Sequence, residues 1–166
     1  MLQYTATAML STAPQINSPL RDILYRSSET EEQGGVQYEF WFVFEGCCLY
    51  HGLKGGFEYV PAPAAEARPI PRTDDPMCMG NPHEQLFGAA LCGIYDDGDE
   101  EDGFILCLDN GHVIHLHTVS MYSDPTAGWY RTLNFYTPLR LSDIDYLDFA
   151  DYISHARMHG ARIPVM

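Results

Sequence analysis

Two histidines are the first residues whose types and spacing could support chemistry. His115 and His117 are two positions apart in a segment with the pattern of a strand, so both imidazoles project from one face, a spacing that zinc and iron sites use. Two ligands do not make a site, and a third would have to come from elsewhere, for example from His51 or His83. We therefore expect a polar pair on a partly covered sheet face and no metal centre.

An acidic run offers a second arrangement of ligands. Residues 96–102 hold six carboxylates around Gly98, and hard cations such as Ca²⁺ prefer clustered oxygen ligands. The spacing does not match an EF-hand loop, because Asp102 stands where the invariant glycine belongs and Leu108 where the bidentate glutamate belongs. We expect a solvated acidic turn or a loop that binds a protein partner, with the contacts made by Asp96, Asp97, Asp99, Glu100, Glu101 and Asp102.

The charge of the whole chain favours the second of these interpretations. It has 23 acidic residues against 9 basic ones, a net charge of −14. Such a surface repels phosphate backbones and anionic lipids, so direct binding to nucleic acid or to a membrane is not expected, whereas a basic protein is attracted. The sequence therefore predicts a non-enzymatic, acidic protein-binding module of the immunity or host-factor-antagonist kind. A structural subunit of a larger assembly is an alternative.

Length and composition predict a single domain. The chain has 166 residues, of which 46% are hydrophobic, enough to bury a core without metal or disulfide support. Its first eighteen residues show no basic segment followed by an apolar run, and no apolar stretch is long enough to span a bilayer, so we expect a cytoplasmic protein. The cysteines are odd in number and are expected to be buried thiols: Cys47, Cys48, Cys78, Cys92 and Cys107.

The local patterns divide the chain into an extended arm at 1–18 and a single α+β domain at 19–166. A short N-terminal helix is expected from Pro19 to Arg26, because Leu20, Ile23 and Leu24 recur at helical spacing after cap residues. Strands are expected next, followed by an irregular, proline-rich excursion. The ranges are Val36–Phe44, Cys47–His51 and Phe57–Val60 for the strands and 61–82 for the excursion.

A β-hairpin is the clearest local motif. Asn110-Gly111 is typical of a two-residue type I′ turn between strands at 104–109 and 112–119. That turn sets the register, so that Cys107 faces Ile114 and Ile105 faces Leu116, and these four side chains are expected to share the core face.

The last part of the chain is expected to add strand and then helix. Trp129–Leu141 has strand character, with Pro138 at an edge or bulge. Ser142 can cap a helix that ends at Gly160, with acidic residues early and basic residues late. The predicted fold is thus α+β: a mainly antiparallel sheet of about five to seven strands, with a short N-terminal and a C-terminal helix.

Three segments in chain order resemble the ADP-ribosyltransferases of the poly-ADP-ribose polymerase type. Leu49-Tyr50-His51-Gly52 resembles their strand-borne Tyr-His-Gly, Gly88–Tyr95 resembles their later glycine-rich segment, and Asn134–Leu147 resembles their closing strands. The resemblance implies an NAD-binding domain in which His51 holds the nicotinamide ribose and Tyr95 stacks on the ring. It places Phe135 where the catalytic glutamate would stand, which implies a degenerate enzyme. In the leading interpretation the protein has no cofactor; NAD is the cofactor of this alternative.

A second resemblance is to the SMI1/KNR4-type immunity fold. It rests on Cys107-Leu108-Asp109, Val113 and the terminal segment with Asp148-Phe149. The resemblance implies a binding protein without catalytic activity.

Overall fold

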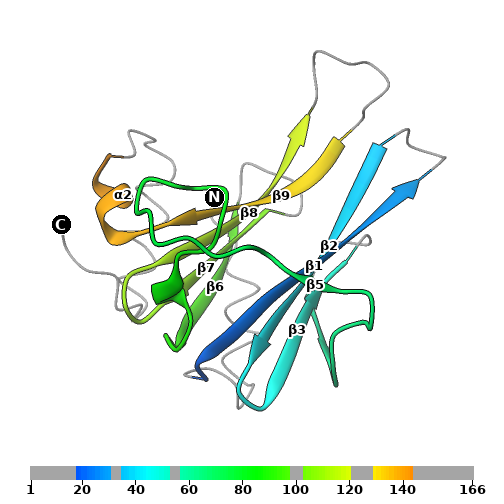
Figure 1. Ribbon diagram of the computed structural model, residues 1–166, viewed down its shortest axis with the longest axis horizontal. Helices are drawn as coiled ribbons and strands as arrows, with labels where there is room; N and C mark the ends of the chain where they lie inside the picture. The colour runs from blue at the N-terminus through cyan, green and yellow to red at the C-terminus, as the bar shows by residue number, and fades with distance from the viewer. Residues whose placement is uncertain (1–17, 31–34, 53–56, 98–102, 121–128, 144–166) are drawn as a thin grey trace.

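The core of the protein lies between two antiparallel sheets (Figure 1). The computed structural model describes residues 18–30, 35–52, 57–97, 103–120 and 129–143. In the first sheet the order is β4-β3-β2-β1-β5, with bounds Leu20–Thr30 (β1), Gly35–Phe44 (β2), Cys47–His51 (β3), Phe57–Val60 (β4) and Arg68–Pro69 (β5). In the second the order is β6-β7-β8-β9, with bounds Leu91–Asp97 (β6), Gly103–Leu108 (β7), Val113–Ser120 (β8) and Trp129–Tyr136 (β9).

Alternation along the strands builds this core. On β2 every second residue faces inward, so Phe40, Phe42 and Phe44 are at most 4% exposed and belong to the core. The opposite sheet contributes the cross-strand partners Leu106 and Ile114, which are fully buried. Burial of each such side chain stabilises the fold by about 1.5–3 kcal/mol relative to exposure. The expected mainly antiparallel sheet is confirmed, and the described residues contain little helix.

The expected N-terminal helix was wrong, because residues 20–30 form strand β1. Leu20 pairs with Phe44 and Asp22 with Val43, so the register shifts between them at a β-bulge. The bulge inserts one residue, and Leu20 and Ile23, which would point to opposite faces of a regular strand, are both fully buried. An apolar spacing of three residues therefore arose from a bulge and not from a helical turn.

The predicted hairpin is present, but its register differs by one residue. Leu106 pairs with Ile114, and Leu108 N–H donates to His112 O at 3.0 Å, which leaves a three-residue loop, 109–111. Gly111 has a φ of +87°, as expected for a type I turn closed by a left-handed residue. The one-residue difference in register changes which side chains share a face. Ile114 lies with Leu106 in the inter-sheet core, whereas Ile105 and Cys107 are buried on the other face of β7.

A short helix, not an edge strand, follows β9. Pro138 is its first residue, and the helix α2 spans Pro138–Asp143. Thr137 caps it, since its hydroxyl oxygen accepts a hydrogen bond from Arg140 N–H at 3.2 Å, and proline suits the first helical position because it lacks a donor there. The expected position of Pro138 in a strand was therefore wrong. Residues 144–160 of the expected C-terminal helix and residues 1–17 of the expected arm lie outside the described residues.

The proline-rich excursion at 61–82 contains the short strand β5 and lies between the two sheets in the chain. Near its middle, β5 pairs with β1, and Ile70 N–H donates to Ile23 O at 3.1 Å. Further along, Met79 O accepts a hydrogen bond from Phe135 N–H of β9 at 2.9 Å. The excursion thus runs along one side of both sheets. None of the described helices is long and apolar enough to cross a membrane.

Candidate functional site

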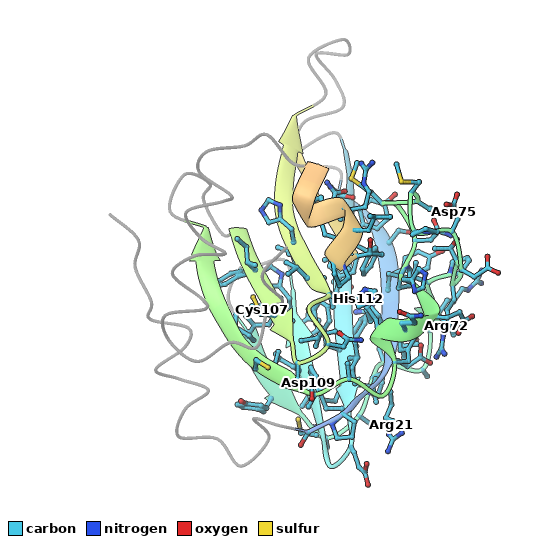
Figure 2. The ribbon with its side chains drawn as sticks, turned by 90° about the vertical axis from the view of Figure 1, so that its left-hand side faces the viewer. Arg21, Arg72, Asp75, Cys107, Asp109 and His112 are labelled. Carbon is cyan, nitrogen blue, oxygen red and sulfur yellow. The ribbon has the colours of Figure 1, made fainter. Side chains whose placement is uncertain are left out.

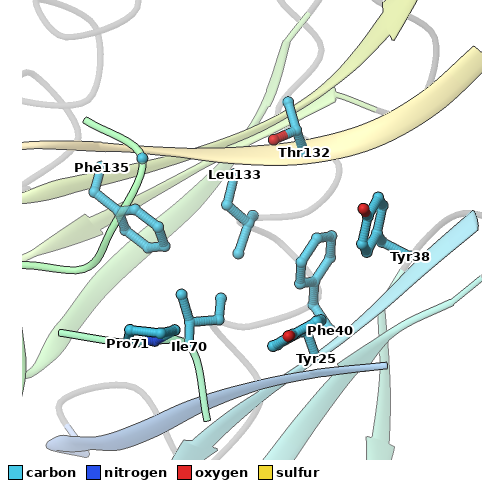
Figure 3. A pocket seen from close by; sticks show the side chains of 9 residues that line it. Tyr25, Tyr38, Phe40, Ile70, Pro71, Thr132, Leu133 and Phe135 are labelled. Carbon is cyan, nitrogen blue, oxygen red and sulfur yellow. The ribbon is translucent and has the colours of Figure 1, made fainter. Parts of the chain in front are cut away.

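A pocket of about 260 Å³ opens between the two sheets (Figure 3). One wall belongs to β1 and β2, the opposite wall to β9, and the excursion closes a third side. The lining residues are Tyr25, Tyr38 and Phe40 from the first wall, Thr132, Leu133 and Phe135 from the second, and Ile70, Pro71 and Gly80 from the excursion.

Strand pairing explains why the aromatic rings meet at this pocket. Tyr25 of β1 is directly opposite Phe40 of β2, and Tyr38 lies two residues before Phe40 on the same face. The Tyr38 and Phe40 ring centroids are 6.3 Å apart at an interplanar angle of 16°, and those of Tyr25 and Tyr38 are 6.4 Å apart at 46°. The rings form an aromatic wall.

The chemistry of the described lining suits the binding of a ligand. The described residues of the lining supply rings, aliphatic side chains and three hydroxyls, from Tyr25, Tyr38 and Thr132, and none of them is charged. Acid–base or nucleophilic catalysis uses an ionisable or activated group aimed at the reacting atom. The pocket offers instead stacking faces, apolar surface and neutral hydrogen-bonding groups.

An ion pair lies on the outer face of the five-stranded sheet. Glu39 is 6% exposed, and its carboxylate accepts hydrogen bonds from Arg26 Nε at 2.7 Å, from Arg26 Nη2 at 2.9 Å and from the Tyr50 hydroxyl at 2.6 Å. The Arg26 guanidinium also lies over the Trp41 ring, 5.3 Å from its centroid. This bidentate geometry is the strong form of a charge-assisted hydrogen bond.

The electrostatics of this cluster fix the protonation state of each member. Hydrogen bonds from Arg26 lower the pKa of the Glu39 carboxyl below its ordinary value, more than burial raises it. Burial, followed by the hydrogen bond to Glu39, raises the pKa of the Tyr50 phenol to about 12. The carboxylate stays ionised and the phenol stays protonated near neutral pH. The cluster is therefore a satisfied ion pair that holds β1, β2 and β3 together, and not an acid–base pair.

Two histidines meet at the end of the hairpin, although the sequence pattern did not pair them. The His83 and His112 ring centroids are 5.4 Å apart, and the residues are 8% and 2% exposed. His83 Nδ1 accepts a hydrogen bond from Gln85 N–H at 3.2 Å, and His83 Nε2 lies 3.2 Å from Asp74 O, which fits a proton on Nε2. Burial, and then the neighbouring His83, lowers the pKa of His112 to about 4.

Neither this pair nor any other group makes a metal site in the part of the chain that the structure describes. Within those ranges no group of three His, Cys, Asp or Glu side chains is arranged to hold an ion. His115 is half-buried on β8, between its strand partners Ile105 and Asn134. His117 pairs with Thr132 through the backbone, and its side chain is outside the described set.

The structure places the residues of the transferase resemblance in different sheets. His51 is in β3, is fully buried, and lies between Phe57 and Phe104, with ring centroids 5.0 Å and 5.6 Å away. Tyr95 is in β6, where its backbone pairs with Ile105, and its side chain is outside the described residues. His51 therefore packs in the inter-sheet core and has no surface on which to meet a ribose.

The acidic run begins inside a strand. Asp96 and Asp97 are the last residues of β6 and pair with Phe104 and Gly103 of β7. Residues 98–102, with Asp99, Glu100, Glu101 and Asp102, lie outside the described residues. Because β6 is at the edge of its sheet, the run continues from an edge strand, where charged side chains oppose pairing with another chain.

The cysteines are thiols, and no disulfide joins them. Cys107 is fully buried, and Cys48 is 3% exposed. Burial raises the pKa of the Cys48 thiol to about 11 and raises the pKa of Cys107 as well. Because the thiolate is the nucleophile, these two side chains are inert at neutral pH.

No family model, curated protein or solved structure matches the chain significantly. Function is therefore inferred from the residues and their geometry alone.

Sequence reasoning missed the pocket and the Glu39 ion pair for the same reason. Within 35–44 the alternation was visible, with aromatic residues at 38, 40, 42 and 44 and Glu39 between them. The strand partners of Phe40 and Glu39 are Tyr25 and Arg26 on β1. The spacing of the apolar residues in that segment had predicted a helix. A strand at 20–30 would have placed Tyr25 beside Phe40 and Arg26 beside Glu39.

Proposed function

We propose that this protein is a non-enzymatic binding module whose acidic surface engages a basic protein partner. The observation that carries the proposal is how the structure distributes its charges. Among the five arginines whose side chains are described, three form ion pairs with carboxylates of the same chain. These are Arg21 with Glu45, Arg26 with Glu39 and Glu66, and Arg72 with Asp22 and Glu84.

The acidic residues are in excess over these pairs. Glu58, Asp74, Asp75 and Asp109 are exposed and form no ion pair with the described residues. Figure 2 shows Arg21, Arg72 and Asp75 at the periphery, whereas Cys107 and His112 lie inside. Within the part of the chain whose side chains are described, these pairs occupy three arginines while the four exposed carboxylates keep their charge, which supports an acidic surface.

A field of this sign mainly affects association with a cation. Complementary charge steers the encounter and raises the association rate by about 10- to 1,000-fold, and salt screens that gain. This increase in association rate does not require shape complementarity between the acidic run and the partner. The carboxylates of 96–102 are the densest part of the field and are the proposed contact surface.

The test uses decalysine as the basic probe and stopped-flow measurement of its association rate. The variant Asp99→Asn, Glu100→Gln, Glu101→Gln, Asp102→Asn removes four charges from the run. The control Glu58→Gln, Glu66→Gln, Asp74→Asn, Glu84→Gln removes four exposed charges elsewhere, so both variants have the same net charge. We expect the first variant to associate on the order of tenfold more slowly than the control.

Salt provides the second readout. The difference between the two variants should disappear as salt rises from about 50 mM to about 300 mM, because screening removes the steering. Equal rates for the two variants at low salt would remove the run at 96–102 from the proposed contact surface. Association that is insensitive to salt in the unmodified protein would contradict the proposed function itself.

A further inference from the structure

We propose that the pocket between the sheets is a binding site for a small, neutral, flat aromatic molecule of two fused rings. The proposal is independent of the acidic surface, since none of the residues that line the pocket is charged. It rests on the volume of the pocket, the composition of its lining and the arrangement of its aromatic rings.

The volume decides the size of the ligand. An apolar cavity of about 150 Å³ is known to accept benzene. The pocket here measures about 260 Å³, enough for a second fused ring but below the volumes, from about 300 Å³ upward, of sites that hold drug-sized ligands. A dinucleotide would not fit.

The composition of the lining decides the charge of the ligand. An anion would find no arginine, lysine or histidine among the lining residues, and it would be repelled by the net charge of −14. A cation would be attracted over a long range, but no carboxylate lines the pocket to compensate for its lost hydration. A neutral molecule loses least water on entry.

The geometry of the rings favours a flat aromatic molecule over an alkyl chain. Phe40 on one wall and Leu133 and Phe135 on the opposite wall are at most 5% exposed, and Tyr25 and Tyr38 add two tilted rings on the side of Phe40 (Figure 3). Aromatic rings gain about 0.5–1.5 kcal/mol per pair beyond the burial of their area when they stack offset or edge-to-face. The Tyr25 and Thr132 hydroxyls of the lining can bind one polar substituent on the ligand.

Gly80 is an exposed residue of the lining at which a side chain can be added. An ideal Cβ built on this residue meets no heavy atom within 4 Å, although the residue lines the pocket. Its φ lies outside the left-handed region, so a side chain can be added there without backbone strain. Gly80→Phe therefore adds a ring at an exposed position of the pocket lining without removing any existing side-chain contact.

The experiment is a calorimetric titration of the full chain with 2-naphthol, a neutral compound of two fused rings with one hydroxyl. We expect saturable binding with a dissociation constant on the order of 0.1 mM. Gly80→Phe should weaken it at least tenfold. Met77→Phe is the control, because Met77 is 52% exposed and does not line the pocket, and its affinity should be unchanged. Tyr25→Phe should weaken binding about fivefold through loss of a neutral hydrogen bond.

A second measurement needs no variant. In a methyl NMR titration of the unmodified protein, the signals of Ile70 and Leu133 should shift with 2-naphthol, while that of Ile105, on the far face of β7, should not. Absence of saturable binding would overturn the proposal, as would equal affinity in a folded Gly80→Phe variant or shifts confined to Ile105. Binding of tetramethylammonium in place of 2-naphthol would overturn it in favour of a cation site.

Discussion

The Tyr50 hydroxyl donates a hydrogen bond of 2.6 Å to Glu39 Oε1 across neighbouring strands of the five-stranded sheet. Glu39 and Tyr50 both lie on the outer face of this sheet, where Tyr50 also packs on Trp41 with ring centroids 5.1 Å apart. A buried carboxylate destabilises a fold unless all of its partners are in place. Stability should therefore depend on these partners in proportion to how much charge each one compensates.

The first prediction concerns how much each partner of Glu39 contributes to stability. Arg26→Ala should lower the free energy of unfolding by about 2 kcal/mol, because it leaves a buried carboxylate without a counter-charge, although solvent at the half-exposed guanidinium moderates the loss. Tyr50→Phe should cost about 1 kcal/mol, since one hydrogen bond is lost and the ion pair remains. Urea unfolding of both variants measures the difference.

Glu66→Gln is the matched control for this prediction. Glu66 pairs with the same arginine at 3.3 Å, but its side chain is 72% exposed, so its removal should change stability by less than about 0.5 kcal/mol. A Glu66 variant as unstable as the Arg26 variant would show that the exposed pair, and not the Glu39 carboxylate, determines the stability of this face.

The second prediction concerns His112 and acid. Its pKa is about 4 in the fold and 6.5 as the ordinary value, because burial disfavours the charged imidazole. Below pH 6.5 the unfolded chain takes up a proton at His112 that the folded chain does not. The free energy of unfolding therefore decreases as the pH falls from 6.5 to about 4. Below about pH 4 the imidazole is protonated in both states, and His112 changes the stability no further. The loss is on the order of 2 kcal/mol.

His112→Gln tests this prediction, since glutamine does not titrate. Urea unfolding at a series of pH values should show a smaller decrease in stability between pH 6.5 and about 4 for the variant than for the unmodified protein. Glu39, whose pKa is lowered in the fold, also contributes loss of stability in acid, but only below the ordinary carboxyl pKa. Curves that run parallel above pH 4.5 would contradict a neutral, buried His112.

The sequence predicted strands where alternation and turn residues agree. The ranges of β2, β3 and β4 match the expected ones within a residue, because aromatic and β-branched residues are flanked there by glycines. It did not predict β1, because a bulge gives Leu20 and Ile23 a helical spacing. Neither pairing partners nor a bulge can be read from a local pattern, since both depend on residues far away in the chain.

The candidate site was less predictable than the fold. The pocket combines β1, β2, β9 and the excursion, and only the register between β1 and β2 brings Tyr25 beside Phe40. In the hairpin, an error of one residue in the predicted loop length changed which side chains face the inter-sheet core. Asn-Gly indicated the turn correctly, but one additional loop residue moved Ile105 and Cys107 away from the inter-sheet core.

The third prediction uses the glycine of that hairpin. Gly111 has a φ of +87°, a conformation that a β-branched residue adopts only with strain. Gly111→Val should lower the free energy of unfolding by about 2 kcal/mol. Gly80→Val is the control, because Gly80 has an ordinary φ and open space around its Cβ, and its stability should change by less than about 0.5 kcal/mol. Urea unfolding that ranks the two variants equally would contradict the three-residue loop.

The last prediction concerns NAD. The transferase resemblance assigns the ribose to His51, but this imidazole is fully buried against Phe57 and Phe104. None of the described residues that line the pocket is an arginine that could bind a pyrophosphate, and the net charge opposes one. We therefore expect no saturable heat when NAD or nicotinamide is titrated into the protein at millimolar concentration. Tyr95→Ala is the informative variant, since it removes the proposed stacking ring from β6, whereas His51 is in β3 of the other sheet. Saturable heat in the unmodified protein that this variant abolishes would establish an NAD site and favour the degenerate transferase over the acidic binding module.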